Sequence, residues 1–271
     1  MIEALHFISG LPRSGSTLLS ALLRQNPRFH AGMSSPLGGL CGTLHQRMGS
    51  GEFSIFFDEA RRTAMLRGLF ESYYGAIPSQ QVIFDTNRSW TGRVPLLALL
   101  FPRSRLICCV REVGWILDSI ERLRARNPLQ VSKMFTPQSA ATVYTRAEAL
   151  MNAEKGLVGS AWSTLREAWF ADEAKRLMVI LYESLVRHPE RTLRKLYHEL
   201  GEAPFDHDYE NVCYEEPDYD AQLGMPGLHT VRSKVNYLER EPRIPPDLIS
   251  KYVNTSFWSN ASLNTRGVVV L

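Results

Sequence analysis

The stretch FISGLPRSGSTLLSALLRQN, residues 7–26, decides the fold. It begins with a short apolar segment, turns between Gly10 and Gly15, and continues into a run of leucines at helical spacing. The two glycines let the backbone come close to a ligand and adopt dihedral angles that other residues avoid. The amides of residues 14–17 would then point at one place at a helix N-terminus, where anions bind. The stretch therefore predicts a phosphate-binding loop between a buried strand and a helix.

The cation of this loop is not where nucleoside-triphosphate-binding loops carry it. Those loops have a lysine directly after the second glycine, and an aspartate at the end of another strand holds Mg²⁺. In this sequence Ser16 takes the lysine position, Arg13 supplies the charge, and the apolar run 105–110 leads into Arg111. A cation there favours a second phosphate and disfavours a magnesium-dependent P-loop kinase. Two anion contacts are thus predicted at the carboxyl edge of a parallel sheet, where open α/β sheets bind ligands.

Apolar segments and helical patterns alternate along the rest of the chain. Buried strands are predicted at 4–9, 82–84, 105–110 and 176–182, and helices at 15–25, 54–74, 91–100, 112–126, 138–170, 188–201 and 245–258. This order predicts an α/β, P-loop-like three-layer fold with a central, mostly parallel sheet flanked by helices. We predict one domain over residues 1–271, with a mobile segment near 31–51 and an irregular cover near 202–247. The final TRGVVVL is either an edge strand or a tail.

Composition narrows the classes of protein that the chain can be. The 271 residues are 44% hydrophobic and carry a net charge of +3. That provides a core, but not the strong basic bias of a general nucleic-acid binder. The four cysteines form no C-x-x-C pair, so a zinc site is not expected. In the absence of a signal-peptide pattern or a membrane-length apolar run, we predict a cytoplasmic protein with neither nucleic acid nor membrane as partner, and leave open whether it forms a homodimer.

Two motifs in this sequence resemble the phosphate-binding motifs of sulfotransferases that use 3′-phosphoadenosine 5′-phosphosulfate (PAPS). The first is Pro12-Arg13-Ser14-Gly15-Ser16-Thr17, in the Arg form that tyrosylprotein-type and many bacterial members of that family carry. The second is the strand-end Arg111 with Ser119 eight residues later. The runs LFPRSRLICCVRE and LYESLVRHPERTLRKLYHEL also resemble segments of the tyrosylprotein enzymes. The resemblance is scattered over residues 5–235, and the two motifs are specific only together.

The resemblance implies an enzyme that transfers a sulfuryl group from PAPS to a hydroxyl acceptor, either a peptide tyrosine or a small molecule. The other product is 3′-phosphoadenosine 5′-phosphate (PAP), and no metal takes part. The resemblance further implies that Arg13 neutralises charge at the transferring end of the donor, while Arg111 and Ser119 hold the 3′-phosphate. The nucleotide-binding residues that it implies are Pro12, Arg13, Ser14, Gly15, Ser16, Thr17, Arg111, Ser119, Tyr182, Arg232, Ser233 and Lys234.

The catalytic part departs from the family pattern. Thr86 stands where family members commonly carry a lysine that contacts the transferred group, and Arg88 is the nearby cation. The Glu that serves as base in tyrosylprotein-type enzymes has no counterpart after the first helix. Asp85 is a candidate base, or equally a buried structural carboxylate. His30 is a second candidate because imidazole titrates near neutrality, whereas the other histidines have no context that favours them. A non-catalytic, nucleotide-binding member of the fold is therefore the alternative function.

Overall fold

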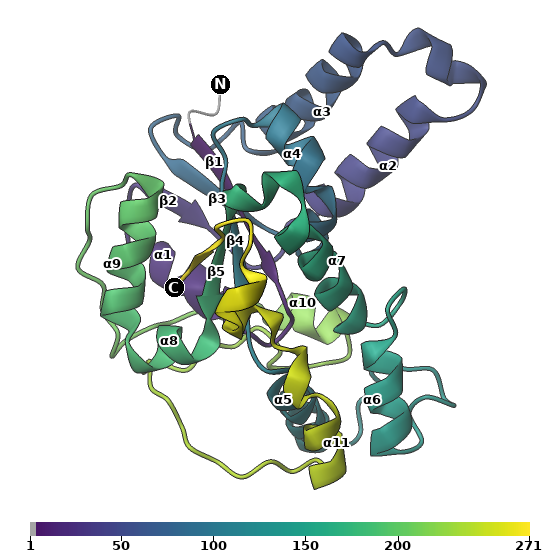
Figure 1. Ribbon diagram of the computed structural model, residues 1–271, viewed down its shortest axis with the longest axis vertical. Coiled ribbons are helices and arrows are strands. Elements are labelled where there is room, and N and C mark those ends of the chain that lie inside the picture. The colour runs from purple at the N-terminus through teal and green to yellow at the C-terminus, as the bar shows by residue number, and fades with distance from the viewer. Residues whose placement is uncertain (1–3) are drawn as a thin grey trace.

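A computed structural model of the protein describes residues 4–271, and its centre is one parallel sheet (Figure 1). The sheet has six strands in the order β2-β3-β1-β4-β5-β6. These are β1 (Ala4–Gly10), β2 (Phe29–Ala31), β3 (Val82–Thr86), β4 (Leu106–Val110), β5 (Leu177–Leu181) and β6 (Val269–Val270). Every pairing is parallel, and Phe7 of β1 lies opposite Asp85 of β3 on one side and Leu106 of β4 on the other. The predicted α/β class and parallel sheet are confirmed.

Alternate strand residues face two separate hydrophobic cores. In β4, Cys108 belongs to one core and Cys109 to the other, because successive side chains of a strand point to opposite faces. The first core is covered by α4 (Val94–Leu100), α5 (Val113–Arg126) and α7 (Gly159–Phe170), and the second by α1 (Ser16–Leu23), α8 (Tyr182–Arg187) and α9 (Pro189–Leu200). Each Leu, Ile or Phe buried there contributes about 1.5–3 kcal/mol. The expected three layers are therefore present.

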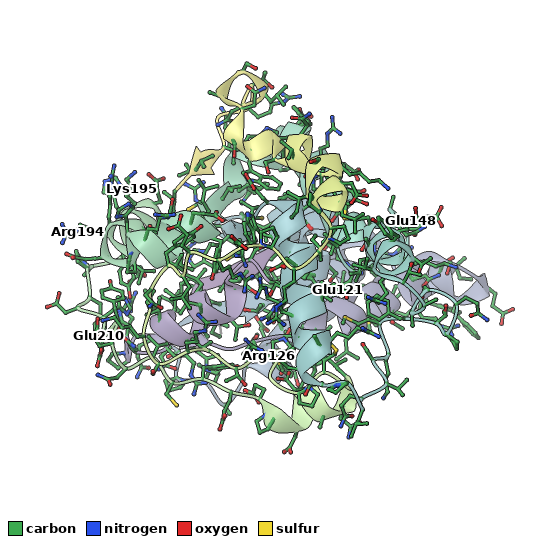
Figure 2. All side chains as sticks on the ribbon, turned by 90° about the horizontal axis from the view of Figure 1, so that it is seen from below. Glu121, Arg126, Glu148, Arg194, Lys195 and Glu210 are labelled. Carbon is green, nitrogen blue, oxygen red and sulfur yellow. The ribbon has the colours of Figure 1, made fainter. Side chains whose placement is uncertain are left out.

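Helix α9 illustrates how sequence pattern becomes a layer. Its Leu193, Leu196 and Tyr197 are buried against the second core. Figure 2 shows Arg194 and Lys195 of the same helix at the outer edge of the molecule. Pro189 opens the helix, and Gly201 ends it with a φ of 72°, a conformation that glycine adopts at no steric cost.

The long pattern at 138–170 is two helices in the structure, α6 (Val143–Met151) and α7. The chain doubles back between them. A Cβ at Gly156 would lie 2.5 Å from the carbonyl oxygen of Leu150, and one at Gly159 would lie 2.2 Å from that of Met151. Only glycine allows this approach, so the helical pattern had to break there.

Other boundaries shift in smaller ways. The pattern at 54–74 becomes η1 (Glu52–Phe56) and α3 (Glu59–Tyr73), which Asp58 caps by accepting a hydrogen bond from the Arg61 N–H at 2.7 Å. A short helix η2 (Arg88–Arg93) precedes α4. The remaining short helices are η3 (Asp172–Arg176), η4 (Val253–Thr255), η5 (Phe257–Ser259) and η6 (Ala261–Leu263).

Within the segment 31–51, expected to be a mobile connection, the structure has the helix α2 (Leu37–Gly49). Leu37, Cys41 and Met48 are buried and give this glycine-rich helix its packed face. In Figure 1, α2 and α3 extend from the sheet as a pair, and the two helices contact each other. The four glycines of α2 are poor helix formers, so the sequence indicated a mobile connection with at most a short helix where the structure has 13 helical residues.

The segment 202–247 contains one short helix, α10 (Pro217–Gln222), and α11 (Pro246–Lys251) begins at its end. Strand β6 pairs with β5 at the sheet edge, so the final segment is an edge strand. None of the helices in residues 4–271 combines the length and the apolar character that a membrane crossing requires.

Candidate active site

The loop between β1 and α1 has an unusual backbone. Arg13 has a φ of 58°, and among residues 4–271 it is the one non-glycine residue with positive φ. Gly10 has a φ of 104°, and a Cβ there would lie 2.2 Å from the carbonyl oxygen of Cys109. Gly15, with a φ of 93°, precedes α1, whose first amides receive no side-chain cap. Such backbone strain persists only where the surrounding structure enforces it. In this loop the strained backbone leaves the amides at the start of α1 free to bind an anion.

A cavity of about 340 Å³ lies over this loop. Its wall includes eleven of the residues predicted from sequence: Pro12, Arg13, Gly15, Ser16, Thr17, Arg88, Arg111, Ser119, Tyr182, Arg232 and Lys234. Of the described residues that line it, seven are Arg or Lys and none is Asp or Glu. A cavity of one sign concentrates field and attracts the opposite charge, so this one is built for anions.

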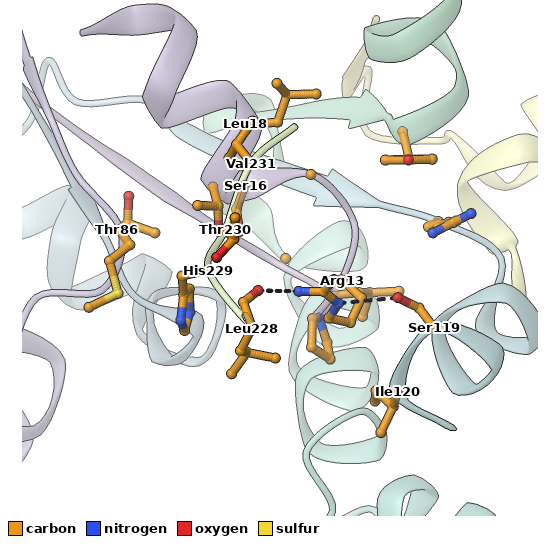
Figure 3. Close-up of a pocket in the computed structure, with 18 of the residues that line it drawn as sticks. Arg13, Ser16, Leu18, Thr86, Ser119, Ile120, Leu228, His229, Thr230 and Val231 are labelled. Atoms are coloured by element: carbon orange, nitrogen blue, oxygen red, sulfur yellow. Dashed lines mark hydrogen bonds between the residues drawn. The ribbon is translucent and has the colours of Figure 1, made fainter. Parts of the chain in front are cut away.

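Arg13 reaches across the cavity from the loop to two other segments. Its Nε donates to the Ser119 Oγ at 3.2 Å, and its Nη1 donates to the carbonyl oxygen of Leu228, as the dashed lines of Figure 3 indicate. Burial, followed by repulsion from Arg111, lowers the pKa of Arg13 to about 10. The guanidinium is thus confined beside another cation, an arrangement that an anion would relieve.

Arg111 follows β4 and lies over the ring of Tyr182, with its guanidinium carbon 4.1 Å from the ring centroid. The same ring packs against the loop, since a Cβ added to Gly15 would be 3.2 Å from it. The Arg111 Nε is buried and has no hydrogen-bond partner, and the nearest carboxylate, Glu183, is 4.0 Å away. An unsatisfied buried donor is costly, so this N–H is available for a ligand.

Segment 223–240 forms one wall of the cavity and is fastened at several points. Lys234 pairs with Glu210 at 2.6 Å, and Arg240 pairs with Asp118 at 3.1 Å. Arg232 also lines the cavity and takes part in no ion pair within the described part of the chain. Ser233 does not line it; its carbonyl accepts from the Val212 N–H at 2.6 Å. Segment 223–240 therefore lies beside the loop, but only some of its basic side chains line the cavity.

Two predicted residues turn away from the cavity. Ser14 is buried and its hydroxyl donates to the carbonyl of Pro12 at 3.3 Å. Asp85 is 0% exposed and accepts hydrogen bonds from Tyr74 at 2.6 Å and from the Trp90 indole at 2.7 Å. Burial raises the pKa of Asp85 and these hydrogen bonds oppose the rise. The interpretation of Asp85 as a base is corrected: it has no access to an acceptor and is a structural carboxylate.

The prediction that His30 is the base is also wrong. His30 lies on β2, packs edge-on against Tyr74 at a centroid distance of 5.7 Å, and is absent from the cavity wall. Burial, followed by the charge of Arg24, lowers its pKa. Thr86 does line the cavity, but its hydroxyl donates to the carbonyl of Gly32 at 2.8 Å. Arg88, the first residue of η2 and two positions after Thr86, supplies the positive charge on this side of the cavity.

The cavity contains a histidine that the sequence reasoning missed. The Asp220 Oδ1 lies 2.5 Å from the His229 Nδ1, and the Asp220 Oδ2 accepts from the backbone N–H of His229 at 2.9 Å. Asp220 is 1% exposed, and the Tyr219 ring packs edge-on against His229 at 5.4 Å. The carboxylate fixes the proton on Nδ1, so Nε2, which no other described group bonds, is free to accept one.

His229 lies three residues before Arg232, in the same segment as the predicted basic residues Arg232 and Lys234. Its partner lies nine residues earlier, across a turn that contains Gly224 and Gly227, both with positive φ. Two glycines between an acidic residue and a histidine were a signal for a chain reversal. That signal was available in the sequence.

Comparisons with known proteins agree with this architecture. A profile described as "Sulfotransferase family" matches residues 6–207. No curated protein matches the chain. The sulfotransferase domain from the Synechococcus PCC 7002 olefin synthase is 21% identical with a TM-score of 0.51, over 93% of this chain and 88% of that one. The domain from the curacin biosynthetic pathway is 18% identical with a TM-score of 0.51, over 94% and 92%. A sulfotransferase from Alicyclobacillus acidocaldarius is 15% identical with a TM-score of 0.50, over 82% and 90%.

Proposed function

Because the chain belongs to the sulfotransferase family, we propose that it transfers a sulfuryl group from PAPS to a hydroxyl acceptor. The observation that supports the proposal is the placement of two groups of basic and hydroxyl side chains after neighbouring strands. Arg13 follows β1, and Arg111 with Ser119 follows β4, and all three line one cavity without acidic residues. A nucleotide with phosphate groups at both ends suits that separation of charge.

The residues present fit such a donor. The Arg111 Nε is buried with no hydrogen-bond partner among the described residues, and burial and Arg111 lower the pKa of Arg13. A bound anion would therefore stabilise both guanidinium groups. We propose that the loop amides, Arg13, Ser16 and Thr17 hold the 5′-phosphosulfate, and that Arg111, Ser119 and Arg232 hold the 3′-phosphate. The chain's own cations supply the charge neutralisation, so we propose that transfer requires no metal.

The chemistry that the donor supplies is a sulfuryl group on a phosphate leaving group: the acceptor oxygen bonds to sulfur, and the electron pair of the broken bond stays on the bridging oxygen. Arg13 and the amides at the start of α1 stabilise charge that develops there, which is usually the largest part of catalysis. Thr86 carries no charge at the end of β3, where a lysine was expected, so Arg13 is the cation proposed for the transferred group.

We propose His229 as the base that takes the proton of the acceptor hydroxyl on its Nε2. Asp220 holds the tautomer and stabilises the imidazolium that forms, as the acidic member of a catalytic triad does. The pair is what distinguishes this protein from a non-catalytic, nucleotide-binding relative, because a buried Asp–His contact of 2.5 Å at a cavity wall has an obvious use in proton transfer.

The acceptor is proposed to be a small molecule rather than a peptide tyrosine. Segment 223–240 forms one wall of the cavity over the loop, on the side of the proposed base His229. An extended peptide would need that segment displaced.

The proposed donor is tested by calorimetry. Wild-type protein is titrated with PAP, with adenosine 5′-monophosphate and with ATP plus Mg²⁺, and the titrations are repeated with Arg111→Gln. We expect PAP to bind at least about tenfold more tightly than the monophosphate in the wild type, with that advantage lost in the variant, because hydrogen bonds to a charged phosphate are the strong ones. Tighter binding of ATP with Mg²⁺ than of PAP would instead support a kinase.

A further inference from the structure

Arg88 is a cation in the cavity that no carboxylate neutralises. It lines the cavity, and no ion pair or side-chain hydrogen bond within residues 4–271 involves its guanidinium. The residue is exposed where it borders the cavity, and the neighbouring protein still lowers the pKa of its guanidinium by desolvation, a shift that the Tyr219 side chain opposes. A guanidinium in such a place is stabilised by a bound anion. The sulfuryl donor already has its own cations, so Arg88 requires another explanation.

The strand order separates Arg88 from the proposed nucleotide contacts. Strand β1 lies between β3 and β4. Arg111 and Ser119 follow β4, whereas Arg88 follows β3, on the other side of the loop. The backbone carbonyl of Arg88 accepts hydrogen bonds from the Ser9 Oγ at 3.0 Å and the Thr91 Oγ1 at 3.2 Å, which fix its position.

The residues around Arg88 lie on the side of the cavity that contains the proposed base His229, where the acceptor hydroxyl would bind. Tyr219, whose side chain favours a higher pKa of Arg88, packs against the proposed base His229. The cavity wall also includes Lys133, which forms no ion pair with any other described residue. Its apolar members include Met33, Met134, Leu157 and Met225. Methionine side chains adapt to irregular apolar ligands. Two cations, Arg88 and Lys133, and an adaptable apolar surface therefore line the same cavity as the proposed base.

We propose that Arg88 binds an anionic group of the acceptor, and that the acceptor is an amphipathic hydroxy acid. Such a molecule offers a hydroxyl to His229, an apolar body to the methionine-rich wall and a carboxylate to Arg88, whose planar fork can bind it through two parallel hydrogen bonds. The inference rests on the proposed function, since it assigns the acceptor of that same site. It gives Arg88 a role in acceptor selection that differs from contact with the transferred sulfuryl group.

Pairs of acceptors that differ only in charge distinguish two roles for Arg88, binding of the acceptor's carboxylate and contact with the transferred sulfuryl group. The probes are 3-(4-hydroxyphenyl)propanoate and its carboxamide, and 8-hydroxyoctanoate and its carboxamide. The ratio of kcat/KM for acid over amide is measured with PAPS in the wild type, Arg88→Gln and Arg88→Met. We expect a ratio of at least about ten in the wild type that falls to within about twofold of unity in both variants, since a charge-assisted bidentate contact is lost. Turnover of the amides should change by less than about threefold.

The control is Arg61→Gln, which removes an exposed arginine of α3 that does not line the cavity. It should leave the ratio unchanged. A wild-type ratio near unity overturns the proposal. An equal loss for acids and amides in the Arg88 variants also overturns it, because that result assigns Arg88 to the transferred group.

A binding arm keeps this test separate from the proposed function. Calorimetry compares 3-phenylpropanoate with 3-phenylpropanamide on wild-type and Arg88→Gln protein, with and without PAP. Preference for the acid that disappears in the variant supports the anion subsite even where no acceptor is sulfated, and absence of preference overturns it. Failure of PAP to bind, with that preference intact, contradicts the donor assignment alone.

Discussion

Removal of His229 is the sharpest test of the catalytic part of the site. A positioned general base contributes about 10²- to 10⁴-fold, so His229→Ala should lower kcat/KM by that factor, which corresponds to about 3–5 kcal/mol of transition-state stabilisation. Asp220 bonds both the ring and the backbone of His229, at 2.5 Å and 2.9 Å. In Asp220→Asn the amide can accept from only one of these donors, and its NH₂ group faces the other. We expect about a 10²-fold loss, because the tautomer is no longer fixed.

The assay is transfer of radiolabelled sulfuryl from PAPS to a phenolic acceptor, measured from pH 5 to 9. The double variant His229→Ala/Asp220→Asn should be no slower than His229→Ala, because the two side chains act as one unit. His45→Ala, in an exposed position on α2, is the matched control and should retain full activity.

The assignment of the base fails if His229→Ala loses less than about fivefold in kcat/KM while PAP affinity is unchanged. Independent, multiplying losses in the double variant would also contradict it, since they would place the two residues in separate roles.

Two predictions concern the fold. Gly10→Ala should lower the free energy of unfolding, measured in urea, by about 2–6 kcal/mol, because it adds positive-φ strain and a collision with the Cys109 carbonyl. Gly39→Ala on α2, with open space around it, should instead raise that free energy by about 0.5–1 kcal/mol. Equal effects of the two substitutions would refute the loop geometry. Burial lowers the pKa of His6 to about 4, and its Nδ1 accepts from the Arg105 N–H at 3.0 Å. The unfolded chain therefore binds more protons between pH 6.5 and 4, and stability should fall by about 3 kcal/mol as pH decreases through that window, a loss that urea titrations of His6→Asn should lack.

The phosphate side of the site could be predicted because its motifs are local. A strand, a glycine turn and a helix set the position of Arg13 within one stretch of chain, and the spacing of Arg111 and Ser119 does the same for the neighbouring strand. Parallel pairing then brings both stretches to one edge. The short strand β2 was missed because three residues carry no readable alternation.

The catalytic side could not be read in the same way. Asp85 and Thr86 are consecutive in β3, so their side chains point to opposite faces. The sequence does not say which of the two faces the cavity, and the structure gives that place to Thr86. His229 and Asp220 meet through a cover segment without periodicity, where Gly224 and Gly227 indicate a turn but not which side chains the turn brings together. Propensity contains no information of that kind.

The most direct test of the account is transfer of radiolabelled sulfuryl from PAPS to a hydroxyl acceptor by the wild type and by Arg13→Ala, in buffer containing a chelator. The account predicts transfer by the wild type without added metal, and a rate at least about 10²-fold lower in the variant, with the fold intact by circular dichroism. Near wild-type transfer by Arg13→Ala, or a strict requirement for Mg²⁺, would contradict it.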